Sequence, residues 1–129
     1  MSIESTRNEI SAVNSKLSSL KSDLKRLQDA KADMDDFTAT VKKYRSNVNE
    51  HKESIDSFAS FSWEGETVGD FKNLYNDAIG DFDMDIIVEC VRISDSLDDR
   101  ILQAQSAVSN NETQLRALNY ELRRLLAAQ

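Results

Sequence analysis

The chain has 129 residues, no proline, three glycines and one cysteine, and charged residues make up 30% of it. This length fits one domain over residues 1–129, and the scarcity of helix breakers and of aromatic residues (7%) favours long helices over a sandwich or barrel. The net charge is −7, and it arises entirely in residues 63–129, which hold thirteen acidic and six basic side chains. Because nucleic-acid binding depends on clustered Lys and Arg, this balance argues against a nucleic-acid partner.

No targeting or membrane-spanning segment stands out in the sequence. Residues 1–7 have no apolar core of signal-peptide length, and no run approaches the ~20 apolar residues of a membrane helix. The single cysteine, Cys90, cannot form a disulfide within the chain and lies in an apolar run, so a small buried side chain is its expected role. We therefore expect a cytoplasmic protein without a membrane span.

The first half of the chain carries a stripe of apolar side chains at helical spacing. Apolar residues recur in steps of three, four and seven from Ile3 to Leu27 and again from Met34 to Phe58, which places them on one side of a helix. Ser2 is a suitable N-cap, because its hydroxyl can accept a hydrogen bond from the first turn. We expect helix one over about residues 3–60.

The second half repeats the pattern. A stripe begins at Phe71 and continues through Ile86 and Ile93 toward the C-terminus, which predicts helix two over about residues 67–127. Gly80 lies inside this helix and predicts either a kink in a continuous helix or a break followed by a third helix. Asn111 occupies a core-type position, where a polar side chain can fix the register at a cost in stability.

A short segment over about residues 61–66 separates the two stripes and contains Trp63 and Gly65. Gly65 can adopt backbone conformations closed to most residues, and a Trp there would cover the open end of the apolar seam. Because so short a turn returns the second helix alongside the first, we predict an all-α fold: a long antiparallel two-helix hairpin, coiled-coil-like, with the Trp-x-Gly turn at its tip. The numbers of two residues that face each other across the hairpin should total about 128, which sets Leu17 near Asn111.

Trp63 and Gly65 are followed by Thr67, Val68 and Phe71. In these residues the chain resembles the WXG family of small exported helical hairpins from bacterial type VII secretion systems. That family includes the ESAT-like proteins and the small helical partners of LXG-domain toxins. Its members have small or apolar residues four and five positions after the Trp, and commonly a Phe eight positions after it. The resemblance covers the whole chain in architecture and about nine residues in motif.

The resemblance implies that the protein works through a partner. Many family members carry a C-terminal Tyr- or Phe-x-x-x-Asp/Glu export signal, whereas Tyr120 is followed four places later by Arg124. Members without the signal often depend on a partner that has it, which points to the partners of LXG toxins. The resemblance thus implies a helical protein partner, the N-terminal domain of an LXG-type toxin, with a second small helical partner or a homodimer as further alternatives. It also implies export by type VII secretion without a cleaved signal peptide.

Residues that could support catalysis or metal binding do not gather in the sequence. Asp81, Asp83 and Asp85 have the spacing that begins a calcium loop, but an EF-hand would need Gly and Glu where Ile86 and Arg92 stand. There is no Cys/His cluster, phosphate-binding loop or Ser/His/Asp set. We therefore expect a protein that is not an enzyme, with no catalytic residue, cofactor or metal site.

The clearest binding feature is the run from Ile86 to Ile93, in which six of eight residues are apolar. A single partner helix covers one stripe, so if Ile86 and Ile93 face helix one, other side chains of the run stay uncovered. The alternative is a helix–helix core that is thickened locally by a bend. The candidate partner interface comprises Ile87, Val88, Val91, Phe37, Val41 and Tyr44.

The leading hypothesis is a non-enzymatic partner, a targeting factor or chaperone, of a type VII secretion effector. It would bind the N-terminal helical domain of an LXG-type toxin and promote its export. The alternative is a cytoplasmic coiled-coil scaffold or self-assembling helical hairpin with no secretion role.

Overall fold

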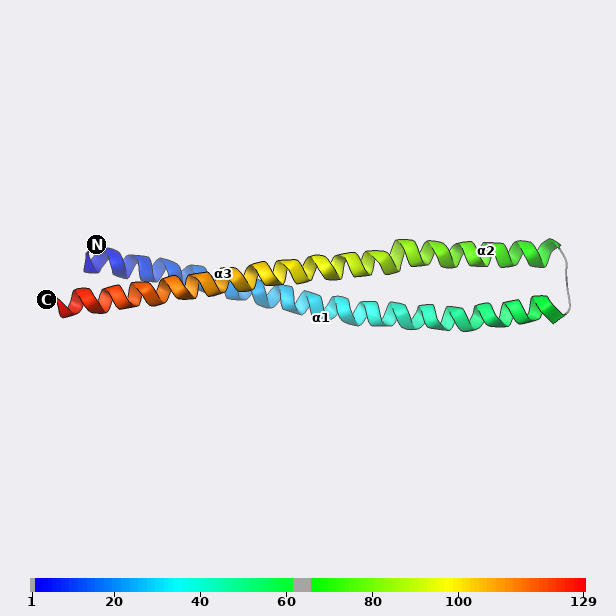
Figure 1. Ribbon diagram of the computed structural model, residues 1–129, viewed down its shortest axis with the longest axis horizontal. Helices are drawn as coiled ribbons and strands as arrows, with labels where there is room; N and C mark the ends of the chain where they lie inside the picture. Colours follow the sequence, from blue (N-terminus) through cyan, green and yellow to red (C-terminus); the bar gives the residue numbers. More distant parts are fainter. Residues whose placement is uncertain (1, 62–65) are drawn as a thin grey trace. The chain divides into compact units, whose positions relative to one another are not determined.

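The computed structural model describes the backbone of residues 2–61 and 66–129, and the side chains of residues 2–54 and 70–129. Residues 2–54 and 70–129 are 97% helical and form two long helical arms, and no strand occurs in the described residues. Figure 1 shows both arms as nearly uninterrupted helix. The predicted fold class, an all-α helical hairpin, is confirmed. The single domain over residues 1–129 stays a prediction.

The first arm is one helix, and the second arm consists of three consecutive helical segments. α1 (Ile3–Phe61) forms the first arm; α2 (Glu66–Phe82), a π-helical turn η1 (Asp83–Ile87) and α3 (Val88–Ala127) form the second. The residues that flank η1 both have right-handed helical backbone angles, with φ/ψ of −60°/−45° and −61°/−42°. The second arm is therefore a continuous helix through Gly80, which decides between the two alternatives that the sequence left open.

The start of α1 is capped as the sequence predicts. The backbone N–H of Ser5 donates to Ser2 Oγ at 3.0 Å, and the backbone N–H of Ser2 donates to Ser5 Oγ at 3.1 Å. One turn on, the Thr6 hydroxyl donates to the Ser2 carbonyl oxygen at 2.8 Å. Because these bonds satisfy polar groups that a helix start leaves without partners, Ser2 is confirmed as the N-cap.

The chain divides into two compact units, and each one pairs a part of α1 with a part of the second arm. The first unit comprises residues 1–31 and 97–129. Within it, the ion pairs Lys21–Glu112 (3.5 Å) and Lys31–Asp98 (3.2 Å) join α1 to α3, and the numbers rise along one helix while they fall along the other. The two helices of this unit are therefore antiparallel.

Leucine and valine side chains form the core of the first unit. Val13, Leu17 and Leu118 are buried, and Ile10, Val108 and Leu115 pack against them. Leu17 thus packs with Leu118, seven residues beyond its predicted neighbour Asn111, because two leucines gain more from mutual burial than a leucine gains against an amide. The numbers of the Lys21–Glu112 pair total 133, a smaller displacement in the same direction, whereas those of the Lys31–Asp98 pair total 129, close to the predicted 128.

Asn111 is buried, with 8% of its surface exposed, and its amide is satisfied inside its own helix. Its Nδ2 donates to the carbonyl oxygen of Ala107, four residues earlier, at 2.8 Å. A buried amide without a partner would cost stability, so this local bond makes the polar side chain tolerable in an apolar seam. A role for Asn111 in fixing the register stays a prediction.

The second unit comprises residues 32–96 and pairs the rest of α1 with α2, η1 and the start of α3. Val41, Ile79 and Cys90 are its buried apolar side chains among the described residues. The hydroxyl of Tyr75 donates to the carbonyl oxygen of Val48 at 3.2 Å and adds a polar contact between the two arms. Cys90 is 3% exposed, which confirms its predicted role as a small buried side chain.

Candidate protein-interaction surface

The motif residues of the predicted turn are only partly within the described side chains. Trp63 and Gly65 lie outside them, so the predicted Trp-x-Gly turn is left as a prediction. Phe71 is described: it is 55% exposed near the start of α2. Its ring stacks on that of Tyr75, with centroids 6.4 Å apart and an interplanar angle of 27°. The pair places aromatic surface on the outside of α2.

The six residues of the predicted partner interface differ in exposure. Val41 is 7% exposed and belongs to the core of the second unit, and Ile87 is half-buried. The exposed fractions of the others are 55% for Phe37, 65% for Tyr44, 52% for Val88 and 46% for Val91. The surface residues thus come from both arms, while Val41 and Ile87 are largely covered by the chain itself. Their use as an interface stays a prediction.

The π-helical turn η1 changes which side of the second arm is covered. A π-turn accommodates one residue more than an α-helical turn, so the residues that follow η1 are rotated by about 100° relative to an uninterrupted α-helix. Ile86, within η1, and Ile93, after it, are 39% and 38% exposed, whereas Cys90 between them is 3% exposed. On the second arm Cys90 is thus more deeply buried than the two isoleucines of the predicted stripe.

Arg45 of α1 is bound to the first residue of η1. Its Nε donates to Asp83 Oδ1 at 2.5 Å and its second terminal nitrogen donates to Oδ2 at 3.0 Å, while the remaining terminal nitrogen donates to Asn49 Oδ1 at 2.5 Å. The hydrogen bond from Arg45 lowers the pKa of the Asp83 carboxyl, and the same bond raises the pKa of the guanidinium. This forked, charge-assisted contact fixes the π-turn against α1.

Beside Arg45, α1 and α2 enclose a groove of about 240 Å³. Apart from Arg45 itself, its walls are aromatic and aliphatic side chains of the second unit. We call it the α1–α2 groove. Its apolar lining consists of Tyr44, Val48, Tyr75, Ala78, Ile79 and Phe82. Sequence reasoning named only Tyr44 among these as an interface residue, because the groove depends on the register that brings Tyr44 to the level of Phe82.

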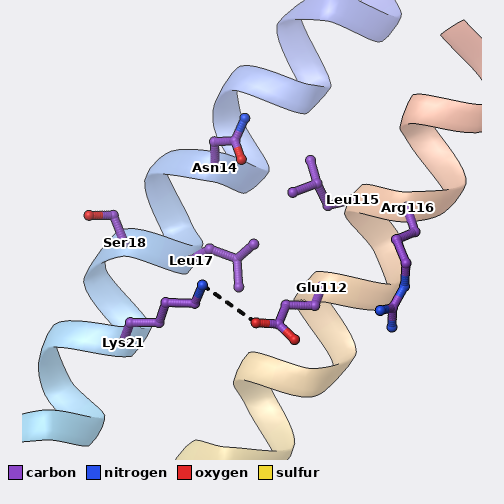
Figure 2. Close-up of a pocket in the computed structure, with 7 residues that line it drawn as sticks. All are labelled: Asn14, Leu17, Ser18, Lys21, Glu112, Leu115 and Arg116. Atoms are coloured by element: carbon purple, nitrogen blue, oxygen red, sulfur yellow. Dashed lines mark ion pairs between the residues drawn. The ribbon is translucent and has the colours of Figure 1, made fainter.

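The first unit has a larger but polar furrow, which Figure 2 shows between α1 and α3. Its volume is about 530 Å³, and Leu17 and Leu115 form its apolar floor. Lys21 and Glu112 form an ion pair in the furrow at 3.5 Å, with side chains that are 59% and 43% exposed. Because water screens such a pair, it contributes little to stability and builds no charged pocket.

The described residues show no other constellation with evident chemistry. No group of three or more His, Cys, Asp or Glu side chains that could hold a metal ion occurs among residues 2–54 and 70–129. Within the part of the chain that the structure describes, no helix is both long and apolar enough to cross a membrane.

Comparisons of the chain with protein-family models, with curated proteins and with solved structures found no match.

Proposed function

We propose that this chain is a non-enzymatic helical partner protein, a targeting factor or chaperone, of a type VII secretion effector. Its target would be the N-terminal helical domain of an LXG-type toxin. The observation that carries the proposal is a row of exposed apolar side chains on the second unit, because a surface of this kind suits a partner helix. The row consists of Met84, Val88 and Val91. The secretion assignment rests on the resemblance around Trp63, Gly65 and Phe71.

Three exposed apolar side chains follow one another on the second arm. Met84 lies in η1 and Val88 and Val91 at the start of α3, with exposed fractions of 67%, 52% and 46%. Val88 and Val91 are three residues apart on one side of α3, and a partner helix that covers them together with Met84 removes apolar surface from water. Full burial of one such side chain contributes about 1.5–3 kcal/mol, before the costs of association are subtracted.

The resemblance supplies the kind of partner. Family members that lack a C-terminal export signal often work with a partner that carries one, and Arg124 stands where the signal from Tyr120 would need an acidic residue. Arg124 is instead paired with Glu121 on the same helix, at 2.6 Å. A companion that depends on its partner for export fits both the missing signal and the exposed row.

The experiment is co-expression with the N-terminal domain of an LXG toxin, followed by co-purification. Val88→Asp and Val91→Asp should abolish the complex, because each puts a charge into the apolar contact. Ser96→Asp, an exposed position on the same helix, is the matched control and should leave the complex intact. Circular dichroism of each variant alone checks that the helices persist. A complex that survives both Val88→Asp and Val91→Asp would contradict the assignment of this row.

The alternative function is a cytoplasmic scaffold or self-assembling hairpin, in which the same row binds a second copy of the chain. Sedimentation of the purified protein distinguishes the two. A dimer that Val88→Asp dissociates favours the scaffold, whereas a monomer that binds only the toxin domain favours the partner role. Secretion that requires the secretion ATPase would add independent support for the partner role.

A further inference from the structure

Apolar surface continues from the α1–α2 groove onto the outside of α2. Phe71, Leu74 and Ala78 lie three and four residues apart, so they share one side of the helix. Phe71 and Leu74 are 55% and 68% exposed, and Ala78 is exposed where it lines the groove. From Phe71 to Phe82 this surface extends about 16 Å along the helix at ~1.5 Å per residue, which is the length of three helical turns.

Acidic side chains border this apolar surface. Three aspartates lie at helical spacing from Leu74 and therefore on the same side of α2. Asp70 precedes Leu74 by four residues, and Asp77 and Asp81 follow it by three and seven. All three are exposed, and no ion pair involves them within the described residues. Asp83, by contrast, is paired with Arg45. Residues 66–87 contain six acidic residues and one basic residue, Lys72.

We infer that the α1–α2 groove and the adjoining face of α2 bind a basic amphipathic helix, a segment with apolar side chains on one side flanked by Lys or Arg. Its apolar side chains enter between Tyr44 and Ala78, and its cationic side chains lie over Asp77 and Asp81. Opposite charges at the rim of an apolar contact speed association and select the partner, while the apolar contact supplies most of the affinity. This inference deepens the proposed function and rests on it for the helical nature of the partner.

Other occupants of the surface fit less well. An acidic helix would meet Asp70, Asp77 and Asp81 with like charges, which opposes binding. A second copy of this chain offers its own acidic α2 at the same place, so symmetric pairing through this face would oppose like charges as well. Residues 32–96 contain fifteen acidic and six basic side chains, so the second unit of another copy carries the same sign of charge.

The test uses two synthetic peptides and the full ¹⁵N-labelled chain. Both peptides are helices of about 18 residues with Leu at the positions of one side, long enough to form when bound; the other positions are Lys in one peptide and Glu in the second. The Lys peptide should bind and shift the amide signals of residues around Tyr44, Ala78 and Phe82. The Glu peptide should bind at least about ten-fold more weakly. Equal affinity for the two peptides, or shifts confined to Met84, Val88 and Val91, would overturn the inference.

Charge reversal on the protein gives the matched control. The double variant Asp77→Lys/Asp81→Lys should weaken the Lys peptide about ten-fold and strengthen the Glu peptide. Asp23→Lys/Asp29→Lys, two exposed acidic positions in the first unit, changes the net charge equally and should leave both affinities unchanged. If both double variants weaken the Lys peptide to the same extent, the binding is non-specific and the inference fails.

The outcome is separable from that of the proposed function. Should the toxin domain co-purify and depend on Val88 while the Lys peptide fails to bind the groove, the partner role stands and this inference falls. Should the Lys peptide bind the groove while the toxin domain does not co-purify, the surface is established for a different helical partner. Tyr44→Ala, which trims an exposed wall of the groove, should weaken the Lys peptide in either case.

Discussion

Arg45 of α1 and Asp83 of η1 join the two arms of the second unit at the one place where the second arm departs from α-helical geometry. The guanidinium donates two hydrogen bonds to the carboxylate, at 2.5 and 3.0 Å, and the Arg45 side chain is 19% exposed. π-turns are rare and occur mostly as single turns inside α-helices. The ion pair ties the first residue of this turn to α1.

The pH dependence of stability should reflect this pair. The hydrogen bond from Arg45 lowers the pKa of Asp83 below its ordinary value of 3.8, so the folded state favours the charged carboxylate. The stabilisation is therefore complete above pH 3.8 and is lost as the pH falls through the lowered pKa. The loss of stability between pH 5 and pH 2 in urea denaturation should be smaller in Asp83→Asn than in the unaltered chain. Equal losses would mean that the pair does not form in solution.

Leu17→Ala should destabilise the first unit by about 2–4 kcal/mol. Leu17 is 5% exposed and packs with Val13 and Leu118, so truncation removes apolar contacts and leaves a cavity. Leu102→Ala is the matched control, because the Leu102 side chain is 62% exposed and should cost less than about 0.5 kcal/mol. Chemical denaturation followed by circular dichroism measures both. Comparable losses in the two variants would place Leu17 outside the core.

Gly80→Ala should stabilise the protein by about 0.5–1 kcal/mol. Gly80 lies inside α2 with no positive φ, and an added Cβ meets nothing within 4 Å. Alanine is therefore accommodated without strain and restricts the unfolded chain more than glycine does. A thermal unfolding scan of the variant gives the answer: a lower melting temperature would show that the chain uses a conformation at Gly80 that alanine cannot adopt.

The sequence predicts the two helical arms but does not reveal η1, the π-turn of the second arm. Steps of three, four and seven predict both long helices, because they require only local periodicity. The run from Ile86 to Ile93 is apolar on nearly every side, so either Ile86 or Ile87 could face α1 without a change in the apolar pattern. Both isoleucines lie in the π-turn η1, whose contact with α1, from Arg45 to Asp83, joins residues 38 apart that no local pattern relates.

The α1–α2 groove was missed for a related reason. Tyr44 and Phe82 each belong to a stripe that the sequence shows, but the groove exists only because the antiparallel register sets these residues side by side. A signal was present in the sequence, namely Leu74 flanked by acidic residues at helical spacing. It becomes meaningful once α2 is known to turn that side away from α1.

Deletion of Met84 should be tolerated, although deletions inside helices usually are not. Met84 is 67% exposed and lies in η1, the π-turn that holds one extra residue. Its removal converts the second arm to regular α-helix, and the residues on both sides keep their orientation toward α1: Ile79 before the turn and Cys90 after it remain buried. Helicity by circular dichroism should be unchanged, and the free energy of unfolding should fall by less than about 1 kcal/mol.

Deletion of Ser106 is the control for this experiment. Ser106 is also exposed, but it lies in the regular part of α3, where removal of one residue rotates the following helix by about 100°. The rotation would turn Leu118 away from Leu17 and disrupt the core of the first unit, so a loss of several kcal/mol is expected. If deletion of Met84 is as damaging as deletion of Ser106, then η1 holds no extra residue in solution. The seam would then have to pass through Ile86 and Ile93, as the apolar periodicity alone predicts.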